Sequence, residues 1–177
     1  MLKAMKDLNT LLSEVTTFIF DYDGVMTEGI VYMDSNGDPL RTSHVKDGYA
    51  LQLAGKLGYH VAIITGATYT NITKRLNALG VHDVYIGVPD KVLKLEEYME
   101  RNQLSPNQIV YMGDDIPDLK VMGRVGVPAC PADAAEEVKQ ISTFVSERPG
   151  GLGCVRDIIE RTLKVQGKWM TAEAFSW

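Results

Sequence analysis

Residues 16–24 read TTFIFDYDG, an apolar run that ends in two aspartates and a glycine. Two later segments have the same form: residues 61–66 read VAIITG, and residues 109–115 read IVYMGDD. A short apolar run bounded by turn residues is typical of a strand buried on both faces. In each segment the polar residues follow the run directly. The pattern therefore predicts buried strands whose carboxyl ends carry polar side chains.

Short apolar runs alternate with longer amphipathic stretches along the whole chain, and this alternation indicates a parallel sheet with crossover helices. The expected strands are 16–20, 61–64, 83–86, 109–112, 125–127 and 143–145. The expected helices are 47–57, 69–79, 90–102, 115–123, 134–141 and 154–165. The predicted fold class is α/β: a doubly wound, mostly parallel, Rossmann-like sheet with helices on both faces. Residues 1–177 are expected to form a single domain.

Two segments depart from the alternation. Residues 29–45 centre on Asn36-Gly37, a strong β-hairpin signal, and an isolated hairpin needs a surface to pack on. That surface is either this chain's own sheet edge or another subunit, and we favour a subunit contact. The C-terminal tail, residues 167–177, contains both tryptophans. It is either a frayed end or a segment docked on a neighbour, and its aromatic residues favour docking.

The composition is that of an ordinary globular protein, with 45% hydrophobic and 23% charged residues. The net charge of -5, with cations spread thinly, argues against non-specific binding of nucleic acid. Cys130 and Cys154 have no metal-ligand spacing and are expected to be reduced packing residues. No apolar run approaches the ~20 residues of a membrane helix. We therefore expect a cytoplasmic protein with no membrane partner.

A group of aspartates follows the predicted strands: Asp21, Asp23, Asp114, Asp115 and Asp118. Carboxyl ends of parallel strands converge on one crevice, where carboxylates so close together would repel one another. A divalent cation relieves that repulsion, and an all-oxygen site that serves a phosphate fits magnesium better than calcium or zinc. A single aspartate there is more often a turn or cap residue. The whole set predicts a Mg²⁺ site.

Asp21 and Asp23 are alternate residues of an extended segment, so both carboxylates can face one substrate. One of them can attack phosphorus, because carboxylates serve as covalent phosphoryl acceptors. The other can protonate the leaving oxygen and then deprotonate the hydrolytic water. Gly24 lets the chain turn away from the pocket.

Thr65, Gly66 and Lys91 are candidate ligands of a phosphoryl group. A hydroxyl and free backbone N–H groups at the start of a helix form a phosphate-oxygen site, although a lone Thr-Gly is more often a plain N-cap. Lys91 begins the helix after YIGVPD, where a cation gains nothing from the helix dipole. It can neutralise the phosphoryl group, and a solvated surface lysine is the alternative.

DYDGVMT at 21–27, IITG at 63–66, Lys91 and GDDIPD at 113–118 resemble, in this order, the four motifs of the haloacid dehalogenase superfamily of phosphatases. The resemblance implies that Asp21 is the nucleophile and a Mg²⁺ ligand. Asp23 would be the general acid–base, with its main-chain carbonyl on the metal. Thr65 and Lys91 would bind the phosphoryl group and Asp114 the metal. Asp115 and Asp118 would support the metal ligands and Lys91.

Asp23 and Thr65 are 42 positions apart, and Thr65 and Lys91 are 26 apart, so neither gap has room for the lid domain of many relatives. The hairpin, HVKDG at 44–48 and GGLGCVRD at 150–157 resemble the 3-deoxy-D-manno-octulosonate 8-phosphate phosphatases. That resemblance implies a phosphorylated sugar acid as substrate, in lipopolysaccharide biosynthesis. It also implies a homotetramer whose hairpins cover neighbouring sites.

Ala67 departs from this family, many members of which carry arginine there. The sugar acid must then be bound from elsewhere, and Arg41, Lys46 and Arg75 are candidates, each more often an ordinary surface cation. A similar clade acts on a nine-carbon 2-keto-3-deoxy sugar acid 9-phosphate, which stays an alternative substrate. Two further alternatives are a phosphorylation-regulated receiver-like module, whose motif order disagrees with this chain, and a non-catalytic relative.

Overall fold

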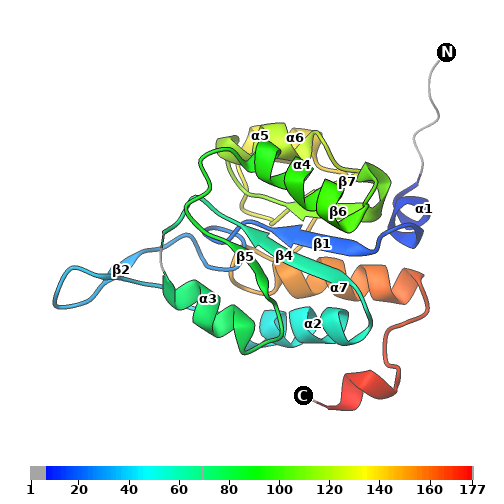
Figure 1. Cartoon of the computed structure of the whole chain (residues 1–177), viewed down its shortest axis with the longest axis horizontal. Coiled ribbons are helices and arrows are strands. Elements are labelled where there is room, and N and C mark those ends of the chain that lie inside the picture. The colour runs from blue at the N-terminus through cyan, green and yellow to red at the C-terminus, as the bar shows by residue number, and fades with distance from the viewer. Residues whose placement is uncertain (1–6, 69, 177) are drawn as a thin grey trace.

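The structure is a computed structural model that describes residues 7–68 and 70–176. Its main sheet has six parallel strands in the order β5-β4-β1-β6-β7-β8 (Figure 1). The strands are β1 Thr17–Phe20, β4 His60–Ile64, β5 Asp83–Tyr85, β6 Ile109–Met112, β7 Val127–Cys130 and β8 Phe144–Val145. β1 and β6 are buried along their whole length. The expected parallel sheet is confirmed.

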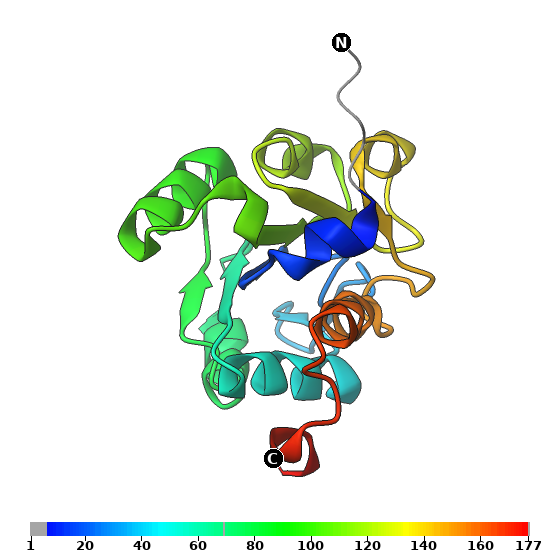
Figure 2. The same cartoon turned by 90° about the vertical axis from the view of Figure 1, so that its right-hand side faces the viewer.

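Helices cover both faces of this sheet (Figures 1 and 2). One layer contains α2 Val45–Lys56, α3 Thr70–Asn77 and α7 Cys154–Val165, with α1 Leu8–Ser13 packed against α7. The other contains α4 Lys91–Asn102, α5 Leu119–Met122 and α6 Glu136–Ile141. Alternate side chains of β1 point to opposite faces of the sheet. Phe18 and Phe20 pack in the core beneath the first helical layer, and Ile19 packs in the core beneath the second.

The order of the strands reverses at β1. From β1 the chain runs to β4 and then outward to β5, and it returns through α4 to β6 on the other side of β1. Ligands of open α/β sheets bind beyond the carboxyl ends of the strands at such a reversal. The fold is therefore doubly wound as predicted, and the reversal lies where the chain leaves β1 at Asp21.

The predicted hairpin exists but pairs over a short length. β2 Tyr32–Met33 and β3 Pro39–Leu40 form a separate two-stranded sheet, which protrudes from the body (Figure 1). The Asp34 carboxylate accepts from the backbone N–H groups of Asn36 at 2.8 Å and Asp38 at 2.9 Å, which holds the turn. Gly37 has φ +83°, so the turn requires a residue that tolerates positive φ.

Some predicted elements differ at their ends. Pro117 lies in a 3₁₀ turn, η2 Ile116–Asp118, so the expected helix 115–123 is α-helical only in α5. β7 begins two residues later than expected and runs to Cys130. Another 3₁₀ turn, η1 Pro106–Gln108, precedes β6. α1 is not among the helices predicted from the sequence, although Asp7 caps it by accepting from the N–H groups of Asn9 and Thr10.

The C-terminal tail lies against this chain's own α2. Its 3₁₀ turn, η3 Ala172–Phe175, is held by Tyr49 Oη, which donates to the Ala174 carbonyl at 2.6 Å. Lys56 Nζ donates to the Ser176 carbonyl at 2.8 Å. Residues 167–176 are therefore not frayed, and a contact of this tail with a neighbouring subunit stays a prediction; Trp177 lies outside the described residues. Among the described helices, none combines the length and apolar character needed to cross a membrane.

Candidate active site

The polar residues after the strands are held by continued sheet hydrogen bonding. Asp21 N–H donates to the Met112 carbonyl at 3.0 Å, one residue beyond β1. Thr65 N–H likewise donates to the Tyr85 carbonyl at 3.0 Å, one residue beyond β4. Backbone paired in this way has little freedom. The sheet therefore fixes Asp21 and Thr65 at one edge, as the sequence predicted.

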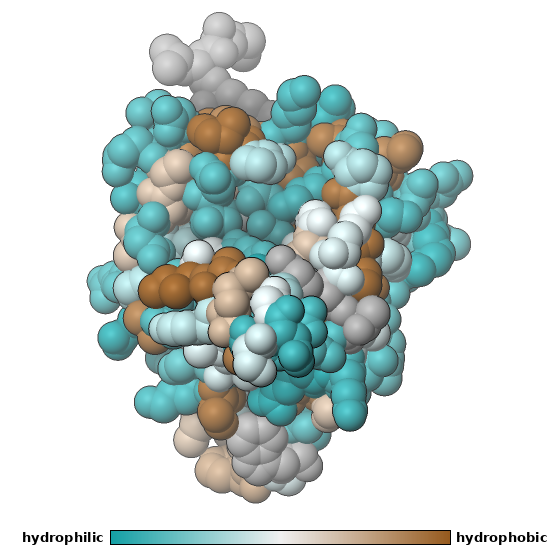
Figure 3. All heavy atoms as spheres, turned by 90° about the vertical axis from the view of Figure 1, so that its left-hand side faces the viewer, coloured by the Kyte–Doolittle hydropathy of each residue, from teal (hydrophilic) through white to brown (hydrophobic). Residues whose placement is uncertain are grey.

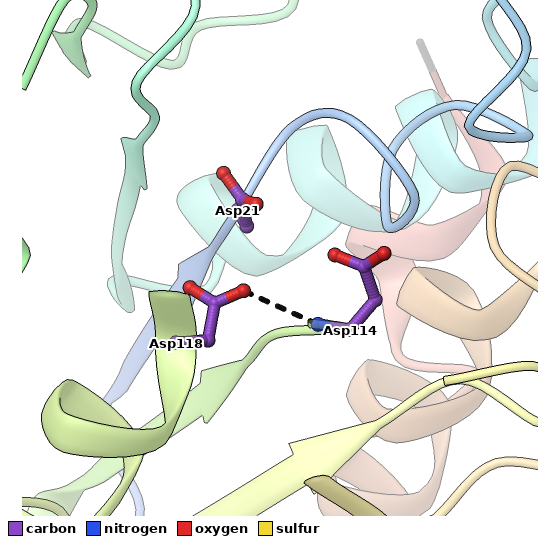
Figure 4. A group of neighbouring side chains, drawn as sticks. All are labelled: Asp21, Asp114 and Asp118. Carbon is purple, nitrogen blue, oxygen red and sulfur yellow. Dashed lines mark hydrogen bonds between the residues drawn. The ribbon is translucent and has the colours of Figure 1, made fainter. Parts of the chain in front are cut away.

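Three carboxylates from two sequence motifs meet at this edge (Figure 4). One oxygen each from Asp21, Asp114 and Asp118 lies within 4.8 Å of the other two. The approach of Asp114 requires Gly24, because a Cβ added to Gly24 would lie 2.0 Å from Asp114 Oδ2. Gly24 also has φ +79°. The lack of room for a Cβ and the positive φ therefore both require glycine at this position.

Lys91 lies between two of these carboxylates. Its Nζ is 3.0 Å from Asp21 Oδ1 and 2.8 Å from Asp118 Oδ1. Burial alone would lower the pKa of Lys91, but the charges of the two aspartates raise it above its ordinary value. Asp90 caps α4 and so sets the position of Lys91 as the first helical residue. Lys91 is therefore a fixed cation and not a solvated surface lysine.

Asp118 has its oxygens occupied by protein donors. Oδ1 accepts from Lys91 Nζ and, at 3.0 Å, from Tyr111 Oη, while Oδ2 accepts from the Asp114 N–H at 3.3 Å (Figure 4). Its side chain orients Lys91 and the Asp114 backbone, which agrees with the supporting role that the resemblance implied. Asp115 accepts from the N–H of Ile116 at 2.8 Å, at the start of η2.

The carboxyl groups of Asp21 and Asp114 are poorly solvated. Burial and the charge of Asp118 raise the pKa of Asp21 to about 6, although Lys91 opposes the rise. Burial and the charges of Asp21 and Asp118 raise the pKa of Asp114 to about 7. A cation beside both groups would favour their ionised forms. This all-oxygen pair at a buried edge fits a hard divalent ion such as Mg²⁺.

A cavity of about 340 Å³ opens at this cluster. Its lining includes the four predicted catalytic residues, together with Gly66, Ala67, Asp114, Asp115 and Asp118. Thr65 is almost fully buried, and its Oγ1 accepts from the Ala67 N–H at 3.1 Å. Figure 3 faces this end of the molecule and shows a hydrophilic hollow beside the hairpin. The structure thus brings the predicted catalytic and metal residues around one open cavity.

The predicted sugar-binding cations are placed differently. Arg41 contacts Asp23, with Nε 2.7 Å from Oδ1. Lys46 lines a separate cavity of about 390 Å³ with Arg148 and Arg156. Arg75 packs its guanidinium against Gly48 of α2, where an added Cβ would lie 3.3 Å from Nη2. Of the three, only Arg41 contacts one of the predicted catalytic aspartates, and the sugar-binding roles of all three stay predictions.

Sequence reasoning missed two features of the site. Tyr111 extends from β6 and donates a hydrogen bond to Asp118. The one signal in the sequence was a polar hydroxyl within an otherwise apolar strand, which needs a partner when it is buried. The loop at Gly150-Gly151 packs on the loop that carries Asp23: a Cβ on Gly150 would lie 1.8 Å from the Gly24 carbonyl oxygen. Gly151 N–H donates to the Val25 carbonyl at 2.9 Å. In the sequence, the adjacent glycines were the only indication that two backbone segments approach each other here.

No protein-family model matches the chain. It is 33% identical over 162 residues to the 3-deoxy-D-manno-octulosonate 8-phosphate phosphatase of Escherichia coli, and the match covers 92% of this chain and 86% of that enzyme. The chain belongs to the 3-deoxy-D-manno-octulosonate 8-phosphate phosphatase family. The resemblance carried by the four motifs is thereby confirmed.

Solved structures of octulosonate phosphatases have the same fold. The enzyme from Yersinia pestis superimposes with a TM-score of 0.89 at 34% identity, over 92% of this chain and 88% of that one. The enzyme from Moraxella catarrhalis superimposes with a TM-score of 0.88 at 28% identity, over 91% and 92%. That crystal structure is a complex with a magnesium ion, a phosphate ion and a KDO molecule.

Proposed function

We propose that this chain is a magnesium-dependent phosphatase that hydrolyses 3-deoxy-D-manno-octulosonate 8-phosphate to the free sugar acid and phosphate. The observation that carries the proposal is the buried Asp21 carboxylate, held 3.0 Å from Lys91 at the carboxyl edge of the sheet in a member of this family. A phosphoric monoester hydrolase of this kind accounts for the whole cluster. The order of the motifs argues against a receiver-like module, and the presence of every catalytic motif residue argues against a non-catalytic relative.

Asp21 is the proposed nucleophile. One of its oxygens attacks phosphorus, the bond from phosphorus to the sugar oxygen breaks, and that oxygen takes the electron pair and a proton from Asp23. Water then attacks the phosphorus of the aspartyl phosphate while Asp23 takes its proton, and the Asp21 carboxylate leaves. Lys91 and Thr65 bind phosphoryl oxygens and stabilise the charge that develops there.

The Asp21 and Asp114 carboxylates, with the main-chain carbonyl of Asp23, would hold the Mg²⁺. When bound, the ion neutralises charge between the carboxylates and the phosphoryl oxygens. The carboxylate pair supports this assignment, because burial and the charges of neighbouring carboxylates raise the pKa of both groups: Asp118 acts on Asp21, and Asp21 and Asp118 act on Asp114. Asp118 and Asp115 orient the neighbouring backbone.

We also propose that the chain is a single cytoplasmic domain that assembles as a homotetramer, with hairpins covering neighbouring sites. The hairpin carries a run of half-exposed apolar side chains: Ile30, Val31, Tyr32, Met33 and Leu40. A protruding apolar surface of this kind is typical of an interaction site. The open cavity at Asp21 supports the same proposal, since it lies beside the hairpin (Figure 3).

Phosphate release from 3-deoxy-D-manno-octulosonate 8-phosphate in the presence of Mg²⁺ tests the function. We expect Asp21→Asn to abolish turnover while its circular dichroism and thermal unfolding stay those of the parent, because an amide cannot act as the nucleophile. Chelation of metal should also stop the reaction. Normal turnover by Asp21→Asn would remove the nucleophile assignment, and activity in excess chelator would refute the role of the metal.

The nine-carbon 2-keto-3-deoxy sugar acid 9-phosphate is a second candidate substrate. Ala67 lines the cavity where many relatives carry arginine, so the contacts to the sugar acid differ here. Comparison of kcat/KM for the two sugar-acid phosphates decides between them, because specificity is a difference in transition-state binding. A higher kcat/KM for the nine-carbon compound would replace the first substrate and leave the phosphoryl chemistry unchanged.

A further inference from the structure

Arg41 holds Asp23 by two contacts. Its Nε donates to Oδ1 at 2.7 Å, and its Nη2 donates to Oδ2 at 3.3 Å. The Arg41 side chain is only 8% exposed, whereas that of Asp23 is 38% exposed. Because Arg41 directly follows β3, the ion pair ties the hairpin to the loop that carries both catalytic aspartates.

Both oxygens of Asp23 are engaged in this arrangement. Asp23 lines the cavity beside Asp21, and the proposed reaction requires one of its oxygens to meet the sugar oxygen and later the water. A guanidinium offers only donors and matches a carboxylate in a fixed two-point geometry. The pair therefore has to open, or at least shift, before Asp23 can serve the leaving group.

The proposed substrate carries a group that can replace Asp23. It is a sugar acid with its carboxylate and its phosphate at opposite ends of the carbon chain. When the phosphate is bound at Asp21, the carboxylate therefore lies farther from Asp21, toward the opening of the cavity. Arg41 contacts Asp23, which lines the cavity, from the end of the hairpin that protrudes on this side of the molecule (Figures 1 and 3). An ion pair with a partner more than a third exposed is weak, and exchanging one carboxylate for another keeps the guanidinium paired.

On the basis of the proposed function, we propose that the substrate carboxylate takes Arg41 from Asp23, so that recognition of a sugar acid also frees the acid–base residue. Phosphate esters without a carboxylate can bind at Asp21 but leave Asp23 paired, and they turn over slowly. Arg41 is then a positioning residue that determines specificity. This gives a site without a lid a means of rejecting neutral sugar phosphates, because binding energy is used to assemble the reactive state.

The test compares two substrates with equally poor leaving groups: the octulosonate 8-phosphate and a neutral hexose 6-phosphate. We expect Arg41→Ala to raise kcat on the hexose phosphate about 10-fold and to lower kcat/KM on the sugar-acid phosphate about 10-fold or more. Arg41→Lys, which keeps the charge but not the two-point geometry, should lie between the parent and Arg41→Ala. On p-nitrophenyl phosphate, whose leaving group needs no proton, the gain should be smaller.

Arg101→Ala is the matched control. It removes an arginine from Asp83, with which Arg101 Nη2 makes a 2.7 Å ion pair, at the β5 edge of the sheet. Both kinetic parameters should stay at the parent values in this variant. Thermal unfolding of each variant confirms that the fold is retained.

The two substrates separate the outcomes. A loss on the sugar acid with no gain on the hexose phosphate would make Arg41 a plain substrate ligand and overturn the proposal, as would equal losses on both or no effect on either. If the parent enzyme turns over the hexose phosphate but not the octulosonate 8-phosphate, the proposed function fails instead. The hexose-phosphate comparison of parent and Arg41→Ala then still decides whether the ion pair restrains Asp23.

Discussion

At the scale of single residues, the site is an electrostatic arrangement around Asp21. Lys91 is the only cation within salt-bridge distance of Asp21 or Asp118 among residues 7–68 and 70–176. Tyr111 and the Asp114 N–H complete the contacts of Asp118. Because these groups are buried, each removal leaves a partner without compensation.

Replacement of Lys91 by Met should reduce both activity and stability. We expect kcat to fall about 100-fold or more, because the cation beside the phosphoryl group is lost. The free energy of unfolding should fall by about 3 kcal/mol, because Asp21 and Asp118 lose their buried partner. Steady-state kinetics and urea unfolding measure the two effects.

Lys94→Met is the matched control on the same helix. Lys94 pairs with Glu97 at the surface, so this change should stay within about 0.5 kcal/mol and leave kcat unaltered. Equal effects of the two substitutions would contradict the role given to Lys91.

The raised pKa values of Asp21, about 6, and Asp114, about 7, predict how stability depends on pH without metal. The folded state holds these protons to higher pH than the unfolded state, whose carboxyl groups titrate near 3.8. The free energy of unfolding of the metal-free protein should therefore fall as pH rises from about 4 to about 7. For Asp21 alone the loss is roughly 3 kcal/mol.

Mg²⁺ should raise the melting temperature more at pH 8 than at pH 5, because the ion binds the ionised carboxylates. Asp114→Asn should flatten the pH dependence and remove most of the effect of Mg²⁺. Thermal unfolding with and without Mg²⁺ at the two pH values gives the comparison. An equal effect of Mg²⁺ at both would show that these carboxylates do not hold the ion.

At the scale of elements, two loops fit together without space for a side chain. Gly150 faces the Gly24 carbonyl, and Gly151 lies against Thr27 and Glu28. Asp47 at the start of α2 accepts from the N–H groups of Gly153 at 3.2 Å and Arg156 at 2.7 Å. The start of α7 is thus attached to α2 as well as to the loop that carries Asp23.

Gly150→Ala should disturb the site through this contact. The added Cβ would lie 1.8 Å from a backbone oxygen, so the loop with Asp23 and Gly24 has to move. We expect a loss of about 1–3 kcal/mol in the free energy of unfolding and a lower kcat. Gly55→Ala in α2 is the control: nothing lies within 4 Å, and alanine should stabilise the helix by about 0.5–1 kcal/mol. A fully active, stable Gly150→Ala enzyme would show that the contact does not position Asp23.

At the scale of the whole molecule, the sheet places one open cavity and one protruding apolar hairpin at the same end (Figures 1 and 3). A two-stranded hairpin has little stability of its own in water. Tyr32 and Met33 are 52% and 63% exposed. An assembly that buries them would stabilise the hairpin and cover the cavity together.

Substitution of both Tyr32 and Met33 by Ser should therefore convert the proposed tetramer to smaller species without unfolding the sheet. Light scattering after size-exclusion chromatography measures the mass, and circular dichroism the fold. Leu93→Ser, which changes a similarly exposed apolar residue on α4, should leave the mass unchanged. A parent protein that is monomeric at micromolar concentration would end the proposal of assembly.

The sequence alone determined the parallel sheet, both helical layers, the hairpin and the four motifs at the strand ends. These depend on local patterns: the period of apolar residues, the turn at Asn36-Gly37, and polar residues directly after a strand. Parallel pairing brings strand ends together, so Asp21, Thr65 and Asp114 could be grouped before any coordinates. The ends of the elements were predicted less accurately, and α1 was not predicted. The 3₁₀ turn at Pro117 and the Asp7 cap each involve only one turn of the chain, which is too short to give a periodic pattern.

Only the tertiary structure decided which distant groups meet. The pairing of Arg41 with Asp23, the contact of Tyr111 with Asp118 and the packing of Gly150 on Gly24 join separate segments. The tail docked on its own α2 is a contact of the same kind. No periodicity encodes such contacts, because they depend on how whole elements pack and on the reach of individual side chains. The chemistry of the site was therefore readable from local patterns, whereas its control by Arg41 required the fold.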